Sequence, residues 1–342
     1  MGRGDGQGDG QGDGWYGAVG RPAFFALPPE ASHRLATAIL TLPLPWERIG
    51  GGARDPSIEV DLCGITLPNP IGLAAGFDKA CRHLGALGRL GFGFVVGGTI
   101  TRAPRNGNPK PRIVRSPRRG AIVNSMGLPN PGADAAAANL ARTRRTAPRF
   151  ASVADEDLEA ATGTVELLAP HVDGFELNAS SPNAPWRHDA AHMSTLLATI
   201  RGRTELPVLL KLPPFTSDEE RATVLNLARV AVDAGAQGLV CSNTIPVKEP
   251  RLAAGHGGLS GAPLRELTPR IVSDVAAATG RTVPLVASGG VSTTDDVRAC
   301  LDAGATAVQL YTGLIYRGPG ILGDLTRGLS APRPATEAPG TG

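Results

Sequence analysis

Two segments of the sequence indicate its fold class most clearly: Leu285-Val-Ala-Ser-Gly-Gly290 and Ala307-Val-Gln-Leu-Tyr-Thr-Gly313. Each is a short apolar run that ends in glycine and hydroxyl residues, and an amphipathic stretch of helical character separates them. Short apolar runs bounded by turn residues are typical of strands that are buried on both faces. The two stretches therefore indicate a strand–helix–strand unit of a parallel sheet.

The same pattern recurs along the chain from residue 70. Amphipathic helices such as Glu156–Leu168 and Glu219–Ala234 fill the gaps between the runs. Eight such units predict an α/β fold, a (β/α)8 TIM barrel, within residues 51–330. A doubly wound open sheet is the alternative, but no Gly-x-Gly-x-x-Gly follows the first strand. The predicted strands are Pro70–Ala75, Gly93–Gly97, Arg149–Val153, Gly174–Asn178, Val208–Leu212, Gly238–Ser242, Leu285–Ser288 and Ala307–Tyr311.

Composition excludes several classes of protein. The 342 residues include 34 Lys and Arg against 31 Asp and Glu, a balance too even for a nucleic-acid binder. No run of 18 apolar residues and no secretory signal is visible, so we expect neither a membrane span nor secretion. The cysteines form no Cys-x-x-Cys pair, which predicts buried or idle thiols in a reducing compartment. They are Cys63, Cys81, Cys241 and Cys300.

Both ends of the chain are predicted to be disordered tails, residues 1–20 and 331–342. The first contains a Gly-Asp-Gly-Gln repeat that spaces three aspartates evenly, but the pattern of a calcium loop is absent. His188 and His192 stand four residues apart, as metal-binding histidines can, yet no third ligand is evident. We therefore expect no metal.

Residues 21–50 read as a short helical extension. Phe24 and Phe25 precede Pro28-Pro29-Glu30, which opens a predicted helix that continues to Leu40. Two interpretations remain open: a helical pair docked on the barrel, or a patch that enters a membrane interface. Residues 100–123, rich in Arg, Pro, Asn and Gly, are predicted to form a small hairpin over the barrel mouth.

The carboxyl ends of barrel strands carry active sites, and here they carry polar residues and glycines. Gly289 and Gly290, with Tyr311 and Thr312, follow the last two strands, where barrels bind phosphate through bare backbone amides. We expect the loop Gly257–Gly261 to close over the same group. Turn glycines without a ligand are the alternative.

Four asparagines indicate recognition of a planar heterocycle, because each amide offers both a donor and an acceptor. They are Asn124, Asn178, Asn183 and Asn243. A role as turn residues is the alternative. Lys211 interrupts the apolar run Val208-Leu-Leu-Lys-Leu, so it is predicted to point inward, where an anion or a ring with negative density must match its charge.

These residues resemble the dihydroorotate dehydrogenase family over residues 21–330. The motifs that carry the resemblance are Asn69-Pro-Ile-Gly-Leu-Ala-Ala-Gly-Phe-Asp-Lys79, Gly107-Asn-Pro-Lys-Pro-Arg112, Asn178-Ala-Ser-Ser-Pro-Asn183, Gly257-Gly-Leu-Ser-Gly261 and Gln309-Leu-Tyr-Thr312. The resemblance implies an FMN-dependent barrel that oxidises dihydroorotate to orotate in pyrimidine biosynthesis.

The resemblance also implies roles for single residues. Ser181 matches the catalytic base of the quinone-reducing, membrane-associated class, and the soluble class has cysteine there. The orotate-contacting positions are Lys79, Asn124, Asn178, Asn183, Asn243 and Thr244. The FMN-contacting positions are Ala75, Gly76, Thr99, Asn178, Lys211, Ser242, Gly261, Gly289, Gly290, Tyr311 and Thr312. The quinone tunnel is lined by His33, Arg115 and Tyr311. A peripheral location on the cytoplasmic face of the cell membrane follows.

The chain is a divergent member, because some stretches look more like the soluble class. These are Asn124-Ser-Met-Gly-Leu-Pro-Asn130 and Leu210-Lys-Leu-Pro-Pro214. A soluble acceptor such as fumarate, or a paralogue that acts on another dihydropyrimidine, is therefore the alternative. A flavoprotein without turnover is disfavoured by the intact Lys79, Ser181 and asparagines.

Overall fold

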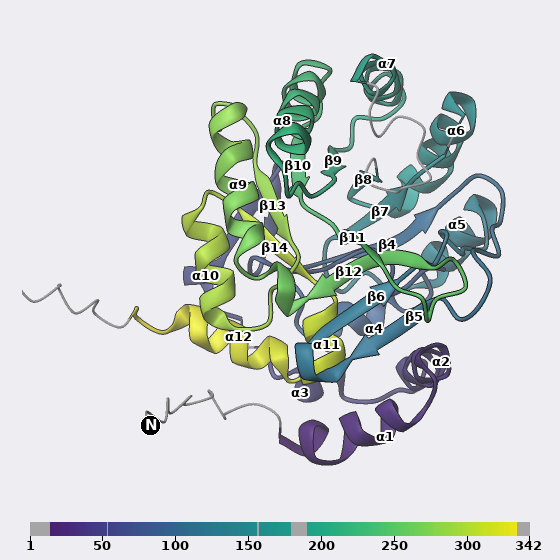
Figure 1. The fold of residues 1–342 in the computed structure, drawn as a ribbon, viewed down its shortest axis with the longest axis vertical. Helices are drawn as coiled ribbons and strands as arrows, with labels where there is room; N and C mark the ends of the chain where they lie inside the picture. Colours follow the sequence, from purple (N-terminus) through teal and green to yellow (C-terminus); the bar gives the residue numbers. More distant parts are fainter. Residues whose placement is uncertain (1–13, 53, 156, 179–189, 334–342) are drawn as a thin grey trace, which may run out of the picture.

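The computed structural model describes residues 14–52, 54–155, 157–178 and 190–333. Its centre is a closed barrel of eight parallel strands, in the order β10-β13-β14-β3-β4-β7-β8-β9 (Figure 1). Each predicted strand overlaps one of them, so the predicted (β/α)8 barrel is confirmed. The strands are β3 (Ile71–Leu73), β4 (Phe94–Ile100), β7 (Arg149–Val153), β8 (Gly174–Asn178), β9 (Val208–Leu212), β10 (Gly238–Cys241), β13 (Leu285–Ser288) and β14 (Ala307–Leu310).

The barrel interior has an apolar floor. Inward side chains such as Phe94, Phe150 and Val240 pack there against Leu62 and Leu67, which are fully buried. These two leucines come from a hairpin that closes this end of the barrel, β1 (Val60–Leu62) and β2 (Ile65–Leu67). Its two turn residues both have positive φ, the conformation that matches the twist of a tight hairpin.

Helices cover the outside of the barrel and bury their apolar faces against the strands. In the longest of them, α8, the Ser217 side chain caps the first turn, and residues such as Leu227 and Ala231 face the core. The helices are α4 (Leu84–Arg89), α5 (Ala133–Arg142), α6 (Leu158–Leu168), α7 (Ala190–Arg201), α8 (Asp218–Asp233), α9 (Leu267–Ala278), α10 (Thr294–Asp302), α11 (Thr312–Arg317) and α12 (Ile321–Ser330).

A small antiparallel sheet lies at the mouth of the barrel. The predicted hairpin in residues 100–123 is present as β5 (Ile113–Ser116) and β6 (Ala121–Asn124). It continues through β12 (His256–Gly261) to β11 (Ile245–Lys248). The prediction of a loop at Gly257–Gly261 is therefore wrong. Its glycines permit close pairing, because a Cβ at Gly258 would lie 2.0 Å from the Thr244 hydroxyl oxygen.

The N-terminal extension forms short helices, one of which lies against β5 of this sheet (Figure 1). They are η1 (Tyr16–Gly20), α1 (Arg21–Ala26), α2 (Pro29–Leu40) and α3 (Trp46–Gly50). The prediction of a disordered tail over residues 1–20 is therefore wrong for Tyr16–Gly20, which form η1. The Tyr16 hydroxyl holds this segment on the barrel domain by donating to the carbonyl oxygen of Ile315 at 2.8 Å. Within the described residues, no helix is long and apolar enough to cross a bilayer.

Candidate functional site

One cavity of about 1050 Å³ begins at the carboxyl ends of the barrel strands and continues under α1 and α2. Thr99, Lys211 and Gly289 line its barrel end. Phe24 and Leu40 line its other end, where apolar side chains predominate. The cavity therefore joins a polar compartment in the barrel to an apolar one under the extension.

Most of the site residues predicted from the sequence line this cavity. They are His33, Ala75, Gly76, Lys79, Thr99, Arg115, Asn124, Asn178, Lys211, Asn243, Thr244, Gly261, Gly289, Gly290, Tyr311 and Thr312. Ser242 is buried beside the cavity rather than on its wall, and its hydroxyl donates to the carbonyl oxygen of Asn243 at 3.3 Å. Ser181 and Asn183 lie outside the described residues, so their roles stay predictions.

Lys79 supplies a positive charge at the mouth. It follows β3, and its ammonium group donates to the carbonyl oxygen of Gly76. Burial and the nearby Arg112 guanidinium lower the pKa of Lys79 to about 8, although Asp78 and Glu30 oppose this effect. Lys79 is thus still mostly protonated at neutral pH, and an incoming carboxylate would stabilise its charge.

Hydroxyl and amide groups form a chain along the wall between three neighbouring strands. The Asn178 side-chain amide donates to the Thr99 hydroxyl at 3.3 Å, and that hydroxyl lies 3.0 Å from the Ser152 hydroxyl. Asn178 stands at the carboxyl end of β8, opposite Lys211 on β9. These hydrogen bonds hold the Asn178 side-chain amide in one orientation at the cavity wall.

The predicted inward orientation of Lys211 is correct, and its matching anion is a carboxylate of the chain itself. The Lys211 ammonium lies 3.3 Å from a Glu176 carboxylate oxygen and 3.2 Å from the side-chain amide oxygen of Gln309. The Gln309 amide donates to the second Glu176 oxygen at 2.8 Å. Sequence reasoning missed Glu176, although it stands two residues before Asn178, on the same face of β8.

Glycines and hydroxyls form the wall where phosphate binding is predicted. Gly289 and Gly290 follow β13 with φ of 123° and 77°, a backbone conformation that side chains disfavour. Nearby, the Ser260 and Thr312 hydroxyls lie 2.9 Å apart. This wall offers bare backbone and hydroxyl donors, which are suited to a phosphate.

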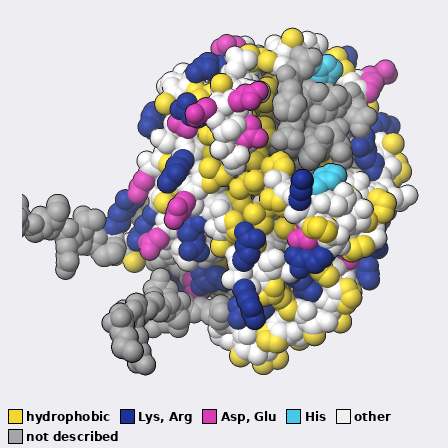
Figure 2. Space-filling view, in the orientation of Figure 1, with side chains coloured by type: hydrophobic (Ala, Val, Ile, Leu, Met, Phe, Trp, Pro, Cys, Tyr) yellow, Lys and Arg dark blue, Asp and Glu magenta, His cyan; other side chains and the backbone are white. Residues whose placement is uncertain are grey.

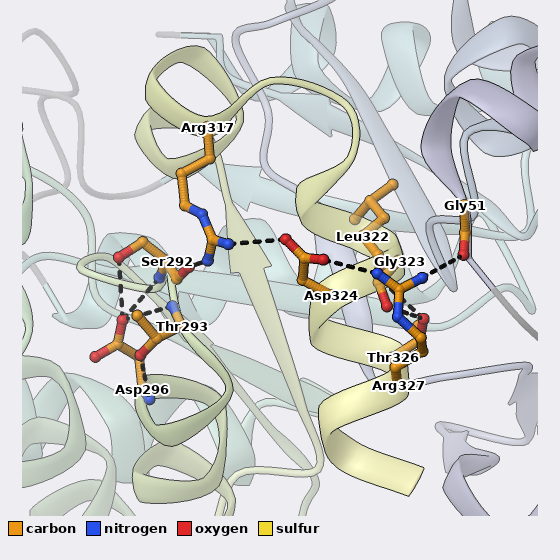
Figure 3. Close-up of polar contacts among 10 residues, drawn as sticks. All are labelled: Gly51, Ser292, Thr293, Asp296, Arg317, Leu322, Gly323, Asp324, Thr326 and Arg327. Carbon is orange, nitrogen blue, oxygen red and sulfur yellow. Dashed lines mark hydrogen bonds and ion pairs between the residues drawn. The ribbon is translucent and has the colours of Figure 1, made fainter. Parts of the chain in front are cut away.

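A network of arginines and aspartates supports the loop after β13 from behind (Figure 3). Arg317 donates to the Ser292 carbonyl oxygen at 2.6 Å and to Asp324 at 2.8 Å. Asp324 also pairs with Arg327, which reaches the Gly51 carbonyl oxygen at 3.5 Å. The network connects the glycine loop to α12 and to the end of the N-terminal extension.

His33 and Tyr311 meet across Phe77 where the two compartments join. The Phe77 ring contacts His33 edge-on, with centroids 5.3 Å apart, and Tyr311 at 5.8 Å. Burial, with the nearby charge of Lys79, lowers the pKa of His33 to about 4. His33 is therefore neutral at pH 7, and its imidazole offers one donor and one acceptor.

Arg115 does more than line the apolar compartment. From β5 it donates to the backbone carbonyl oxygens of Phe24, Phe25 and Leu27, and its guanidinium lies 4.5 Å from the centre of the Phe25 ring. Arg115 thus binds the carboxyl end of α1 and fixes the helix over the cavity.

A second anchor holds α2. Glu30, in the first turn of α2, pairs with Arg112 at 3.0 Å and with Lys110 at 3.2 Å. Arg112 is almost fully buried and also donates to the carbonyl oxygens of Asn106 and Asn108. This pair joins the extension to the motif Gly107–Arg112.

Sequence reasoning missed Trp15 and Tyr16, which line the apolar compartment. A Cβ at Gly318 would lie 2.3 Å from the Tyr16 ring, so this glycine makes room for it. Because both aromatic residues directly follow a glycine-rich repeat, they were predicted to belong to a disordered tail.

Comparisons with known proteins agree on one family. The family model described as dihydroorotate dehydrogenase matches residues 57–332. A protein of Erythrobacter litoralis named dihydroorotate dehydrogenase (quinone) is 40% identical over 326 residues, which cover 91% of this chain and 93% of the relative. A Leifsonia xyli protein of the same name is 39% identical, with 89% of this chain and 95% of the relative covered. The crystal structure of Eimeria tenella DHODH in complex with ferulenol superposes with a TM-score of 0.77 at 30% identity, covering 88% of this chain and 90% of that one.

Proposed function

Since the chain belongs to the dihydroorotate dehydrogenase family, we propose that it oxidises dihydroorotate to orotate with bound FMN and passes the electrons to a quinone. This is a step of pyrimidine biosynthesis. The observation that carries the proposal is the single cavity that joins the polar barrel mouth to the apolar space under α1 and α2. Two substrates of opposite polarity would then reach one cofactor from two sides.

The donor set of the barrel end fits FMN. The bare backbone at Gly289 and Gly290, with the Thr312 hydroxyl, suits the phosphate, and Lys211 suits the polar edge of the ring system. Ala75, Gly76, Thr99 and Gly261 would line the remainder. When bound, the flavin supplies the acceptor for the hydride from C6 of dihydroorotate.

The residues of the chain would bind the substrate and move its proton. Lys79 would pair with the carboxylate of dihydroorotate, and Asn124, Asn178 and Asn243 would hold its ring through donor and acceptor pairs. Ser181 would accept the C5 proton and pass it to water. Thr244 and Asn183 complete the proposed substrate contacts.

The quinone would enter under the N-terminal helices. Its head would meet His33, Arg115 and Tyr311, and its tail would follow the apolar wall. The exposed large hydrophobic side chains of the described residues are Trp15, Val19, Leu27, Leu35 and Leu42, all in the extension. Hydrophobic side chains mix with Lys and Arg over α1 and α2 (Figure 2), a surface that suits peripheral binding to the cytoplasmic face of the cell membrane.

Cofactor extraction combined with anaerobic titration tests this proposal. We expect one FMN per chain after purification and loss of its visible absorbance when dihydroorotate is added. A folded protein that takes up no FMN would refute the proposal. So would a bound flavin that stays oxidised after dihydroorotate is added.

A further inference from the structure

Lys211, Glu176 and Gln309 form a closed polar triangle inside the barrel. They come from β9, β8 and β14, so the triangle connects strands that are not all neighbours. The side chains of Lys211 and Glu176 are 5% and 1% exposed. Below them lies the apolar floor, and above them lies the cavity that Lys211 and Gln309 line.

The triangle fixes the orientation of all three side chains. The Gln309 amide nitrogen faces Glu176 and its carbonyl oxygen faces Lys211. The reverse orientation would place donors against the ammonium and an oxygen against the carboxylate, so each group holds the others in place. The Lys211 ammonium is thereby held in a water-poor position beside the proposed flavin.

Glu176 also sets how much positive charge the cavity receives. Its carboxylate lies 3.3 Å from the Lys211 ammonium, and in a buried site such a pair cancels most of the field of the cation. Reduction of a flavin adds negative charge, which a cation stabilises and an anion opposes. The balance between the two buried charges therefore acts on the reduction equilibrium.

We propose that Glu176 and Gln309 are positioning residues that set the reduction potential of the bound flavin through Lys211. The inference rests on the proposed FMN site. It predicts opposite effects for two substitutions that nearly preserve side-chain size. Glu176→Gln leaves the charge of Lys211 uncompensated and should raise the potential. Gln309→Met removes the oxygen that holds the ammonium on the side away from Glu176, so Lys211 pairs with the carboxylate alone and the potential should fall.

The test is a spectroscopic redox titration of the flavin-loaded protein. We expect each substitution to change the reduction equilibrium by about tenfold, which corresponds to about 30 mV for a two-electron couple. Glu166→Gln is the matched control, because it removes the same charge from the exposed surface of α6, where Glu166 pairs with Arg203. Its potential should equal that of the wild type.

Opposite shifts support the inference, and unchanged potentials or shifts in the same direction overturn it. Removal of one member of a buried ion pair is destabilising, so Glu176→Gln risks poor folding. In that case Gln309→Met decides alone: a lower potential supports the inference, and an unchanged or higher one overturns it. A wild type that binds no flavin overturns the proposed function as well, which distinguishes the two failures.

Discussion

Burial determines the protonation state of His33, and this makes the extension sensitive to acid. The pKa of His33 is lowered to about 4, whereas an unfolded histidine titrates near 6.5. The unfolded state therefore binds more protons between these values, and the stability present above pH 6.5 is lost as the pH falls towards 4.

From these two pKa values, we expect protonation of His33 in the unfolded state to lower the free energy of unfolding of the wild type by about 2 kcal/mol between pH 7.5 and pH 5. His33→Gln should lack this part of the pH dependence. Urea unfolding at both pH values measures it, with His171→Gln as a matched control at the barrel surface. Equal pH dependence in the wild type and His33→Gln would show that His33 is not held neutral by burial.

Ser181 carries the chemical step of the proposal. Ser181→Ala should slow reduction of the flavin by dihydroorotate by about 10²–10⁴-fold, the typical cost of a lost general base. The FMN content should not change, because the residue is proposed to face the substrate. Stopped-flow absorbance under anaerobic conditions measures the rate, and a wild-type rate in the variant would assign the base elsewhere.

The inward position of Lys211 was predictable, but its partners were not. Both faces of a strand within such an apolar run are buried, so a lysine there cannot point into water from the outside of the barrel. The pattern alone therefore predicted that Lys211 points into the barrel. Glu176 and Gln309 lie 35 and 98 positions away along the chain, and only closure of the barrel brings them together. No periodicity carries that information.

Among the elements, the Arg115 anchor of the extension can be tested separately from the barrel. Arg115→Met keeps the length of the side chain but removes its donors to the end of α1. We expect α1 to open more often and the KM for quinone to rise several-fold. Flavin reduction by dihydroorotate should be unchanged, because that chemistry lies at the other end of the cavity.

Hydrogen exchange of residues 21–40 and steady-state kinetics measure these effects. Arg118→Met is the control, because Arg118 belongs to the same hairpin, in the turn η3 (Pro117–Arg119), and is exposed. Unchanged exchange in Arg115→Met would mean that the carbonyl contacts do not hold α1.

Removal of the extension tests its role as a whole. The cut belongs before Leu44, since Trp46 is only 5% exposed and is part of the hydrophobic core between the barrel strands and the helices. Deletion of residues 2–43 should abolish quinone reduction and vesicle binding but leave flavin reduction by dihydroorotate intact. Deletion of residues 2–13 alone should preserve both activities. Full quinone turnover without residues 2–43 would disprove a quinone route under the helices.

Sequence predicted the barrel elements well and the mouth less well. Strands such as Val208–Leu212 are buried on both faces, so their apolar runs stand out. By contrast, β12 reads His-Gly-Gly-Leu-Ser-Gly, a composition typical of turns, and only pairing with β6 and β11 makes it a strand. Tyr16 depends in the same way on Gly318, a glycine more than 300 residues away.

Across the whole molecule, one cavity is proposed to serve two substrates of different polarity. The barrel end contains Lys79 and the asparagines, and the other end is apolar and closed by the extension. A quinone and dihydroorotate would then occupy different ends. A soluble acceptor such as fumarate would need the polar end, where the substrate itself binds.

Reoxidation of the dihydroorotate-reduced protein tests whether the two substrates use different ends of the cavity. Stopped-flow absorbance would follow the return of flavin colour with a soluble quinone analogue and with fumarate, in parallel, on the full chain under anaerobic conditions. We expect reoxidation by the quinone at least tenfold faster than by fumarate, and loss of the quinone rate alone when residues 2–43 are removed. Faster reoxidation by fumarate would contradict this expectation, and the soluble-class markers at Asn124–Asn130 and Leu210–Pro214 would then identify the acceptor.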